Sequence, residues 1–185
     1  MALVLDGNGS MTVGNGDITG INTGALPSTF IGAGAVLQVV SATKTDTFTT
    51  GSTSFIDITG LSVSITPTSA SSKILVMYSL MHGTNASSFP LVRLVRGATA
   101  IAVGAASGSR AQVTSVAWSS GETNVTNMQS MNFLDSPATT SSTTYKLQIV
   151  TTTGTTHYIN RNARDADGDY EPRAVSTITV MEIAA

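Results

Sequence analysis

The sequence predicts an all-β protein, an antiparallel β-sandwich or jelly-roll head, and three observations support this fold class. The chain holds 29 Thr and 23 Ser among 185 residues, and the branched side chain of threonine favours extended backbone. Apolar and hydroxylated residues alternate in short runs, as at Leu61, Val63 and Ile65 with serine between them. Glycine and proline turn signals recur at short intervals, and we find no helical period.

The first element is an extended arm rich in glycine and asparagine, over residues 1–34, and residues 35–185 form the predicted head. In the arm, short apolar pieces such as residues 3–5 and 11–13 alternate with glycine–asparagine turns. Glycine and asparagine tolerate the positive φ that tight turns need. Because the arm cannot bury a core of its own, we expect residues 1–30 to pack on copies of themselves or on a scaffold protein. A flexible leader is the alternative.

The head is expected to contain eight to ten strands, drawn from twelve candidate segments. Turn signals such as Gly51, Gly60, Gly97 and Gly154 separate the candidates. The candidates are residues 35–43, 46–50, 54–59, 61–66, 73–82, 90–96, 99–103, 111–119, 125–134, 143–152, 155–160 and 174–183. Strands this short and this frequent are typical of a sandwich or a barrel.

Two of these segments break the alternation, because consecutive apolar residues stand at 74–78 and again near the C-terminal end, at 178–183. A strand that is apolar on both faces must be covered on both faces. In a two-layer sandwich the second cover is either another subunit or a long loop, and the sequence leaves both open. The residues expected at an interface between subunits are Ile74, Val76, Met77, Tyr78, Ile178, Val180, Met181 and Ile183.

Residues 161–173 hold seven of the 20 charged residues and predict an exposed loop before the last strand. Alternating carboxylates at Asp165, Asp167 and Asp169 are the oxygen ligands that Ca²⁺ requires, but Gly168 falls too early for an EF-hand loop. Three arginines can neutralise the same carboxylates, so we expect an ion-paired loop that serves recognition and holds no metal. The residues expected to contact a partner are Arg161, Arg164, Asp165, Asp167, Asp169, Tyr170, Glu171 and Arg173.

Charge and motif content argue against several classes of function. A net charge of −2 without a basic block argues against nucleic acid as a partner. The chain has no cysteine, and no run approaches the ~20 apolar residues of a membrane helix. It has no nucleophile elbow and no phosphate-binding loop, and His82 and His157 are expected to be structural residues at strand ends. We therefore expect no enzyme, no cofactor and no membrane partner.

Four segments of the chain resemble one known group of proteins. Residues 3–10 are similar to the N-termini of small virion-appendage proteins of tailed bacteriophages that infect marine bacteria and cyanobacteria. Residues 38–46, 67–76 and 176–183 resemble the head domain of that group, through strand-and-turn patterns. The resemblance covers most of the chain. It implies a β-sandwich or jelly-roll head that forms a homotrimer, and an N-terminal segment that anchors it to the particle.

The resemblance also implies a location and a function, and it carries no catalytic residues. We expect a virion structural protein on the particle surface, assembled in the host cytoplasm, in the form of a homotrimeric short tail fibre or knob. Residues 1–30 would bind other virion proteins, and a host-surface glycan would be contacted through an aromatic residue such as Tyr170 or Trp118. The loops expected to face the host are residues 83–89, 104–110, 119–124 and 161–173. A capsid decoration or cement protein of the same fold is one alternative, and a jelly-roll carbohydrate-active enzyme is another.

Overall fold

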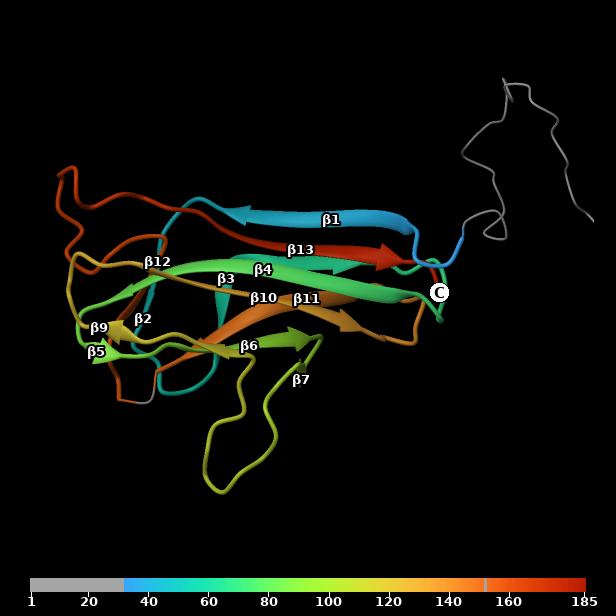
Figure 1. Cartoon of the computed structure of the whole chain (residues 1–185), viewed down its shortest axis with the longest axis horizontal. Helices are drawn as coiled ribbons and strands as arrows, with labels where there is room; N and C mark the ends of the chain where they lie inside the picture. Colours follow the sequence, from blue (N-terminus) through green and yellow to red (C-terminus); the bar gives the residue numbers. More distant parts are fainter. Residues whose placement is uncertain (1–31, 152) are drawn as a thin grey trace, which may run out of the picture. The chain divides into compact units, whose positions relative to one another are not determined.

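The computed structural model describes residues 32–151 and 153–185, and within them every regular element is a β-strand (Figure 1). The predicted all-β fold class is confirmed. The chain divides into two units, residues 1–32 and 33–185. The predicted arm lies outside the described residues except for its last three, and only the second unit is described below.

Thirteen strands are found in the described residues, more than the eight to ten expected, because several are ladders of only two or three residues. Seven strands have six or more residues and form the frame of the head. In chain order the strands are β1 (Val36–Lys44), β2 (Phe48–Thr50), β3 (Ile56–Ile65), β4 (Lys73–Thr84), β5 (Ser87–Ser88), β6 (Leu91–Arg96), β7 (Thr99–Ile101), β8 (Ser115–Val116), β9 (Ser119–Ser120), β10 (Asn127–Asp135), β11 (Thr143–Val150), β12 (His157–Ile159) and β13 (Ser176–Ile183).

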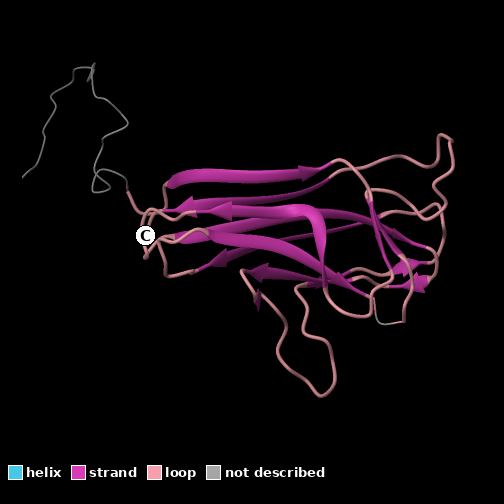
Figure 2. Ribbon diagram, turned by 180° about the vertical axis from the view of Figure 1, so that it is seen from behind, coloured by secondary structure: helices cyan, strands magenta, loops and turns pink. Residues whose placement is uncertain are grey.

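Two antiparallel sheets form the layers of a sandwich, which Figure 2 shows from behind. The first sheet has the order β1-β13-β4-β12-β2, and β10 pairs with the other edge of β4. The second sheet has the order β3-β11-β6-β7, and β8 also pairs with β6. Strand β4 is the central strand of the first sheet, because it pairs with β13 along its first part and with β12 at its end. Strands β5 and β9 form a separate two-stranded ribbon.

The hydrophobic core lies between the two sheets and follows the period-two alternation of the strands. In β4 every second side chain is buried and those between are half-buried, and β13 repeats this pattern. Each fully buried aliphatic side chain contributes about 1.5–3 kcal/mol to stability. The core is formed by Ile58, Leu61, Val63, Ile65, Ile74, Val76, Tyr78, Leu80, Val92, Leu94, Tyr145, Leu147, Ile149, Ile159, Ile178 and Val180.

The predicted turn at Gly60 is wrong, because residues 56–65 form one continuous strand, β3. Gly60 has a φ of +88°. The register between β3 and β11 shifts at this point, from Ser62 opposite Lys146 to Asp57 opposite Gln148. A glycine at positive φ with an interrupted ladder is a β-bulge. Two predicted strands are thereby one bulged strand.

The predicted strand over residues 111–119 is largely wrong. Only the short strands β8 and β9 form there, and the residues before β8 belong to a loop that begins after β7. In this loop the Gly104 N–H donates to the Val113 carbonyl at 3.1 Å. The ribbon partner of β9 is β5, which lies inside the predicted loop 83–89. Within this segment only residues 115–116 and 119 pair in strands, with β6 and β5 respectively, so the alternation does not extend into one long strand.

Candidate recognition end and assembly face

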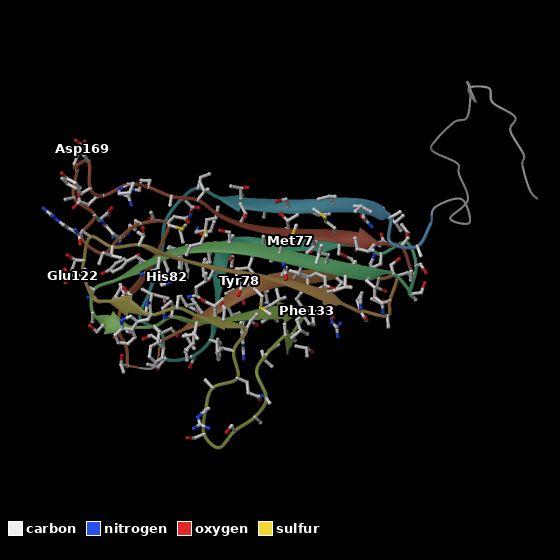
Figure 3. All side chains as sticks on the ribbon, in the orientation of Figure 1. Met77, Tyr78, His82, Glu122, Phe133 and Asp169 are labelled. Atoms are coloured by element: carbon white, nitrogen blue, oxygen red, sulfur yellow. The ribbon has the colours of Figure 1, made fainter. Side chains whose placement is uncertain are left out.

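Three of the four predicted recognition loops come together at the end of the head that lies away from the C-terminus, which we call the loop end (Figure 1). The amides of Ala163 and Arg164 both donate to the Thr123 carbonyl, at 3.0 and 2.9 Å. Pairing of Ser88 with Ser119 joins the other two loops. Figure 3 labels Glu122 and Asp169 at this end. The loop end is therefore built from residues 83–89, 119–124 and 161–173.

The fourth predicted loop, residues 104–110, does not join the loop end. It is part of the connection between β7 and β8, which projects beside the second sheet (Figure 1). Its turn is held locally, since the Arg110 N–H and guanidinium donate to the Ser107 carbonyl and hydroxyl at 3.2 and 2.6 Å. Any partner of residues 104–110 would therefore be bound at the side of the head and not at the loop end.

The charged loop 161–173 contains the ion pairs that its sequence predicts. Asp165 lies 3.4 Å from the guanidinium of Arg161 and 2.6 Å from that of Arg173. Arg164 pairs with Glu171 at 3.2 Å. Arginine and carboxylate therefore neutralise each other across the loop.

Part of this loop remains available to a partner. The side chain of Tyr170 is 81% exposed, and Asp167 and Asp169 are exposed as well. Arg161 stacks on the ring of Tyr158 at 4.1 Å, which ties the loop to β12. Among the described residues no three His, Asp or Glu side chains gather as a possible metal site. The exposed side chains of this loop thus include the Tyr170 ring and the carboxylates of Asp167 and Asp169, together with the ion-paired Arg164 and Arg173, whose side chains are 59% and 56% exposed.

Two histidines lie buried beneath the loop end, His82 on β4 and His157 on the neighbouring strand β12. Both are fully buried, and among the described residues neither ring nitrogen of either side chain has a hydrogen-bond partner. Burial lowers the pKa of His157 to about 4. Burial, and then repulsion by His157, lowers the pKa of His82 to about 4 as well. Both are neutral at pH 7 and serve as packing residues, as their expected structural role requires.

The outer face of the first sheet carries a charged residue, Lys73, at the start of β4 in register with Ile183. We call the uncharged part of this face the assembly face. Strand pairing places Val39, Met181, Leu75 and Leu134 in one rung across four strands. Figure 3 labels Met77, which stands in the next rung. The assembly face consists of Val39, Ser41, Thr43, Leu75, Met77, Ser79, Met81, Met128, Ser130, Asn132, Leu134, Thr177, Thr179, Met181 and Ile183.

The structure corrects five of the eight predicted interface residues. Each of the five has an exposed fraction of 4% or less, because it faces the second sheet and belongs to the core of one chain. Consecutive apolar residues on these strands therefore divide between two faces, as period-two geometry requires. The corrected residues are Ile74, Val76, Tyr78, Ile178 and Val180. Met77, Met181 and Ile183 lie on the assembly face and stay predicted interface residues.

Three apolar side chains of the assembly face are well exposed, and its other apolar residues are half-buried. Val39 is 54% exposed, Met128 60% and Leu134 55%. A shallow depression of about 550 Å³ is lined by Met77, Ser130 and Asn132 of the assembly face and by Tyr78 and Met131, which belong to or pack against the core. Exposed apolar groups that gather on one face indicate a site of interaction.

The outer face of the second sheet has the opposite character. Asp57 accepts from the Lys146 ammonium at 2.7 Å and from the Gln148 amide at 2.6 Å. Gln148 accepts in turn from Arg93, whose guanidinium lies 3.8 Å from the centre of the Phe55 ring. The hydrogen bonds and ion pair of these polar groups make this face a solvated surface. The two outer faces of the sandwich therefore differ in both charge and polarity.

A second exposed apolar cluster lies next to the β5–β9 ribbon, at the residue after β5, the residue before β9 and the end of β8, and we call it the aromatic patch. It consists of Phe89, Val116 and Trp118, which are 36%, 55% and 61% exposed. The two rings are 6.0 Å apart between centroids and tilted by 44°. Trp118 was singled out from the sequence as a possible ligand contact, but its pairing with Phe89 depends on a ribbon that the sequence did not predict.

A buried carboxylate joins the segments at the end of the sandwich where the head begins. The sequence alone does not identify this residue. Glu182 on β13 is fully buried. It accepts from the Gln38 amide at 2.6 Å and from both the backbone N–H and the hydroxyl of Thr68 at 2.7 Å. At this end the Gly34 N–H donates to the Ala184 carbonyl at 2.8 Å. The first residues of the head and the C-terminal strand are thereby joined opposite the loop end.

Comparison with known proteins assigns no family. No protein-family model matches the chain, and no curated protein matches its sequence. A similar solved structure is described as the structure of infectious bursal disease virus, Gx strain, with 16% identity and a TM-score of 0.38. The match covers 80% of this chain and 37% of that chain. A likeness of this extent assigns neither family nor function. No helix in the described part of the chain is long and apolar enough to cross a membrane.

Proposed function

We propose that the protein is a virion structural protein of a tailed bacteriophage, a homotrimeric short tail fibre or knob that recognises a glycan on the host surface. One observation carries this proposal, namely that the start of the head and the loop end lie at opposite ends of the sandwich. The pairing of Gly34 and Ala35 with Ala184 puts the chain's entry beside its C-terminal strand. Anchoring at this entry leaves the three clustered loops free to meet a host.

The assembly face supports the trimeric part of the proposal. Its fifteen residues carry no charge, and at its margin the Lys73 ammonium donates to the Ser136 hydroxyl at 2.8 Å. Identical copies therefore meet there with little repulsion between like charges. Four of them, Met77, Met81, Met128 and Met181, are methionines, whose flexible side chains adapt to a partner surface. Copies of the chain would cover apolar groups that one chain leaves in water.

The loop end supports the recognition part of the proposal. Tyr170 offers an exposed ring, and Asp167 and Asp169 offer acceptors for sugar hydroxyls. Three copies on one axis would present three such ends, and many trimers on one particle would multiply weak contacts into firm adhesion. The proposed function needs no catalysis and no cofactor.

The solution mass of the full chain tests the proposed assembly. We expect a trimer at micromolar concentration, and we expect Met77→Glu to shift it to monomer, because the substitution buries an unpaired charge at the interface. Ser62→Glu is the matched control, since Ser62 is exposed on the outer face of β3 and pairs across strands with Lys146. A monomeric wild-type chain would contradict the proposed trimer. A trimeric Met77→Glu variant would show that the assembly face is not the interface between subunits.

The position on the particle needs a different measurement. A density map of the intact virion is expected to show the head at the tail, with the loop end outward. Density on the capsid shell, with the assembly face or the chain's entry against capsid subunits, would instead favour the decoration protein of the same fold.

A further inference from the structure

We propose that the aromatic patch binds the apolar face of a neutral hexopyranose ring in a host polysaccharide. This inference rests on the proposed function, because it names the chemistry of the glycan and places a contact for it next to the β5–β9 ribbon. It adds a saccharide subsite at Phe89, Val116 and Trp118, apart from the charged loop 161–173.

Strand pairing in the β5–β9 ribbon explains why the rings of Phe89 and Trp118 are exposed to solvent. Ser88 pairs with Ser119, so the residues that flank this pair, Phe89 and Trp118, stand opposite each other. Ser88 and Ser119 are buried, while Trp118 is 61% exposed. The rings therefore point away from the side that packs on the head. The ring centroids are 6.0 Å apart and the ring planes are tilted by 44°, and both side chains are exposed.

The size of the patch indicates its ligand. Stable protein interfaces bury about 800 Å² on each partner, and two rings with one valine offer far less than that. The larger assembly face, with fifteen residues, is the surface of the molecule that suits a protein partner. A pyranose ring has the dimensions of an aromatic ring, and one of its faces presents C–H groups that meet the negative face of an aromatic ring.

Charge around the patch favours a neutral sugar. Residues 86–89 and 115–120 contain serine, alanine, valine and the two aromatics, and no charged residue. Hydroxyl groups of a bound sugar need polar partners at the margin. Val116 pairs with Leu91, which stands two positions before Arg93 on β6. The hydrogen-bonded group of Arg93, Gln148 and Asp57 thus begins beside the patch and can reach a second sugar of the same polymer.

Polysaccharide affinity electrophoresis of the full chain tests the inference, with dextran, mannan and galactan as neutral probes and alginate as the anionic one. We expect at least one neutral polymer to retard the wild-type protein and to shift its fluorescence, because Trp118 is the one tryptophan of the chain. Trp118→Ala should weaken this binding at least tenfold, and Phe89→Ala several-fold. Trp118→Phe keeps an aromatic ring and should retain most of the binding. Binding by this variant would show that the alanine variant loses affinity because it lacks the ring and not because it is unfolded.

The controls separate this inference from other outcomes. Val175→Ser changes an exposed side chain elsewhere, and this variant should bind the same polymer as wild type does. Wild-type affinity in Trp118→Ala, retardation by alginate alone, or no retardation by any neutral polymer would overturn the saccharide subsite. The solution mass of the same sample reports on the proposed function separately. If the protein is a trimer but binds no polymer, the saccharide subsite is contradicted and the proposed structural role is not. If the protein is a monomer that binds polymer through Trp118, the trimer is contradicted and the subsite is supported.

Discussion

At the scale of single residues, Glu182 shows how one buried carboxylate closes an end of the sandwich. Burial raises the pKa of Glu182, but its hydrogen bonds, led by the one from Gln38, outweigh burial and hold the pKa below its usual value. The charged form is therefore the one that the fold stabilises. This contribution is present above the pKa of an unfolded glutamate and is lost as the pH falls through the lowered pKa.

We predict that Glu182→Ala lowers the free energy of unfolding by about 3 kcal/mol, because it leaves the N–H and the hydroxyl of Thr68 without their acceptor. It also removes one of the two acceptors of the Gln38 amide, which keeps its bond to the Thr66 carbonyl. Glu182→Gln should cost less, since its amide oxygen still accepts one of these bonds. Urea unfolding at pH 7 measures both. Asp169→Asn, an exposed site in the charged loop, serves as the control and should change stability by less than about 0.5 kcal/mol. Equal stability of Glu182→Ala and wild type would show that the donors find other partners.

Sequence reasoning could not find Glu182, and the reason is physical. Its donors come from residues 38 and 68, which are more than a hundred positions away along the chain. The local pattern around it, Ile178 to Ile183, is apolar and predicts a strand, which is correct. That pattern contains no signal for a carboxylate that long-range partners satisfy.

At the scale of elements, strand β12 places His157 beside His82 of β4 inside the core. Both pKa values fall to about 4 in the folded chain, against about 6.5 in an unfolded chain. The unfolded chain therefore takes up two protons between pH 6.5 and 4 that the folded chain resists. Stability is full above pH 6.5 and declines as the pH falls toward 4.

We predict that this decline amounts to about 3 kcal/mol for each histidine. Urea unfolding at pH 7, 6, 5 and 4.5 measures it, and the His82→Gln/His157→Gln double variant should show a flatter dependence over this range. Hydrogen exchange should locate the earliest loss of protection in β12 and the loops above it. An identical pH dependence in the double variant would assign the decline to other groups.

The elements also show which sequence signals were sufficient. Alternation at residues 61–66 predicted a half-buried strand correctly, because one side of β3 faces the core. Gly60 was misread, because a glycine at positive φ serves a turn or a bulge, and only the pairing with β11 decides between them. Likewise, the loops were located from local turn signals, but only the topology of two sheets brings three of them together and leaves residues 104–110 aside.

At the scale of the whole molecule, the two outer faces of the sandwich give a thermodynamic prediction. If copies of the chain cover the assembly face, unfolding includes dissociation and depends on protein concentration. We predict that the midpoint of thermal unfolding rises with each tenfold increase in concentration for the wild type. The monomeric Met77→Glu variant should show a lower midpoint without this dependence. Calorimetry at several concentrations measures both, and a constant midpoint for the wild type would contradict the assembly.

The joined termini of the head have a practical consequence for engineering. Because Ala184 pairs with Gly34 and Ala35, a peptide fused after Ala185 leaves the head at the end where the chain enters it. Such a fusion would lie on the particle side of the proposed knob, where it competes with anchoring. Residues 104–110 form a side projection held by local bonds, and that loop is the better insertion point for displayed cargo.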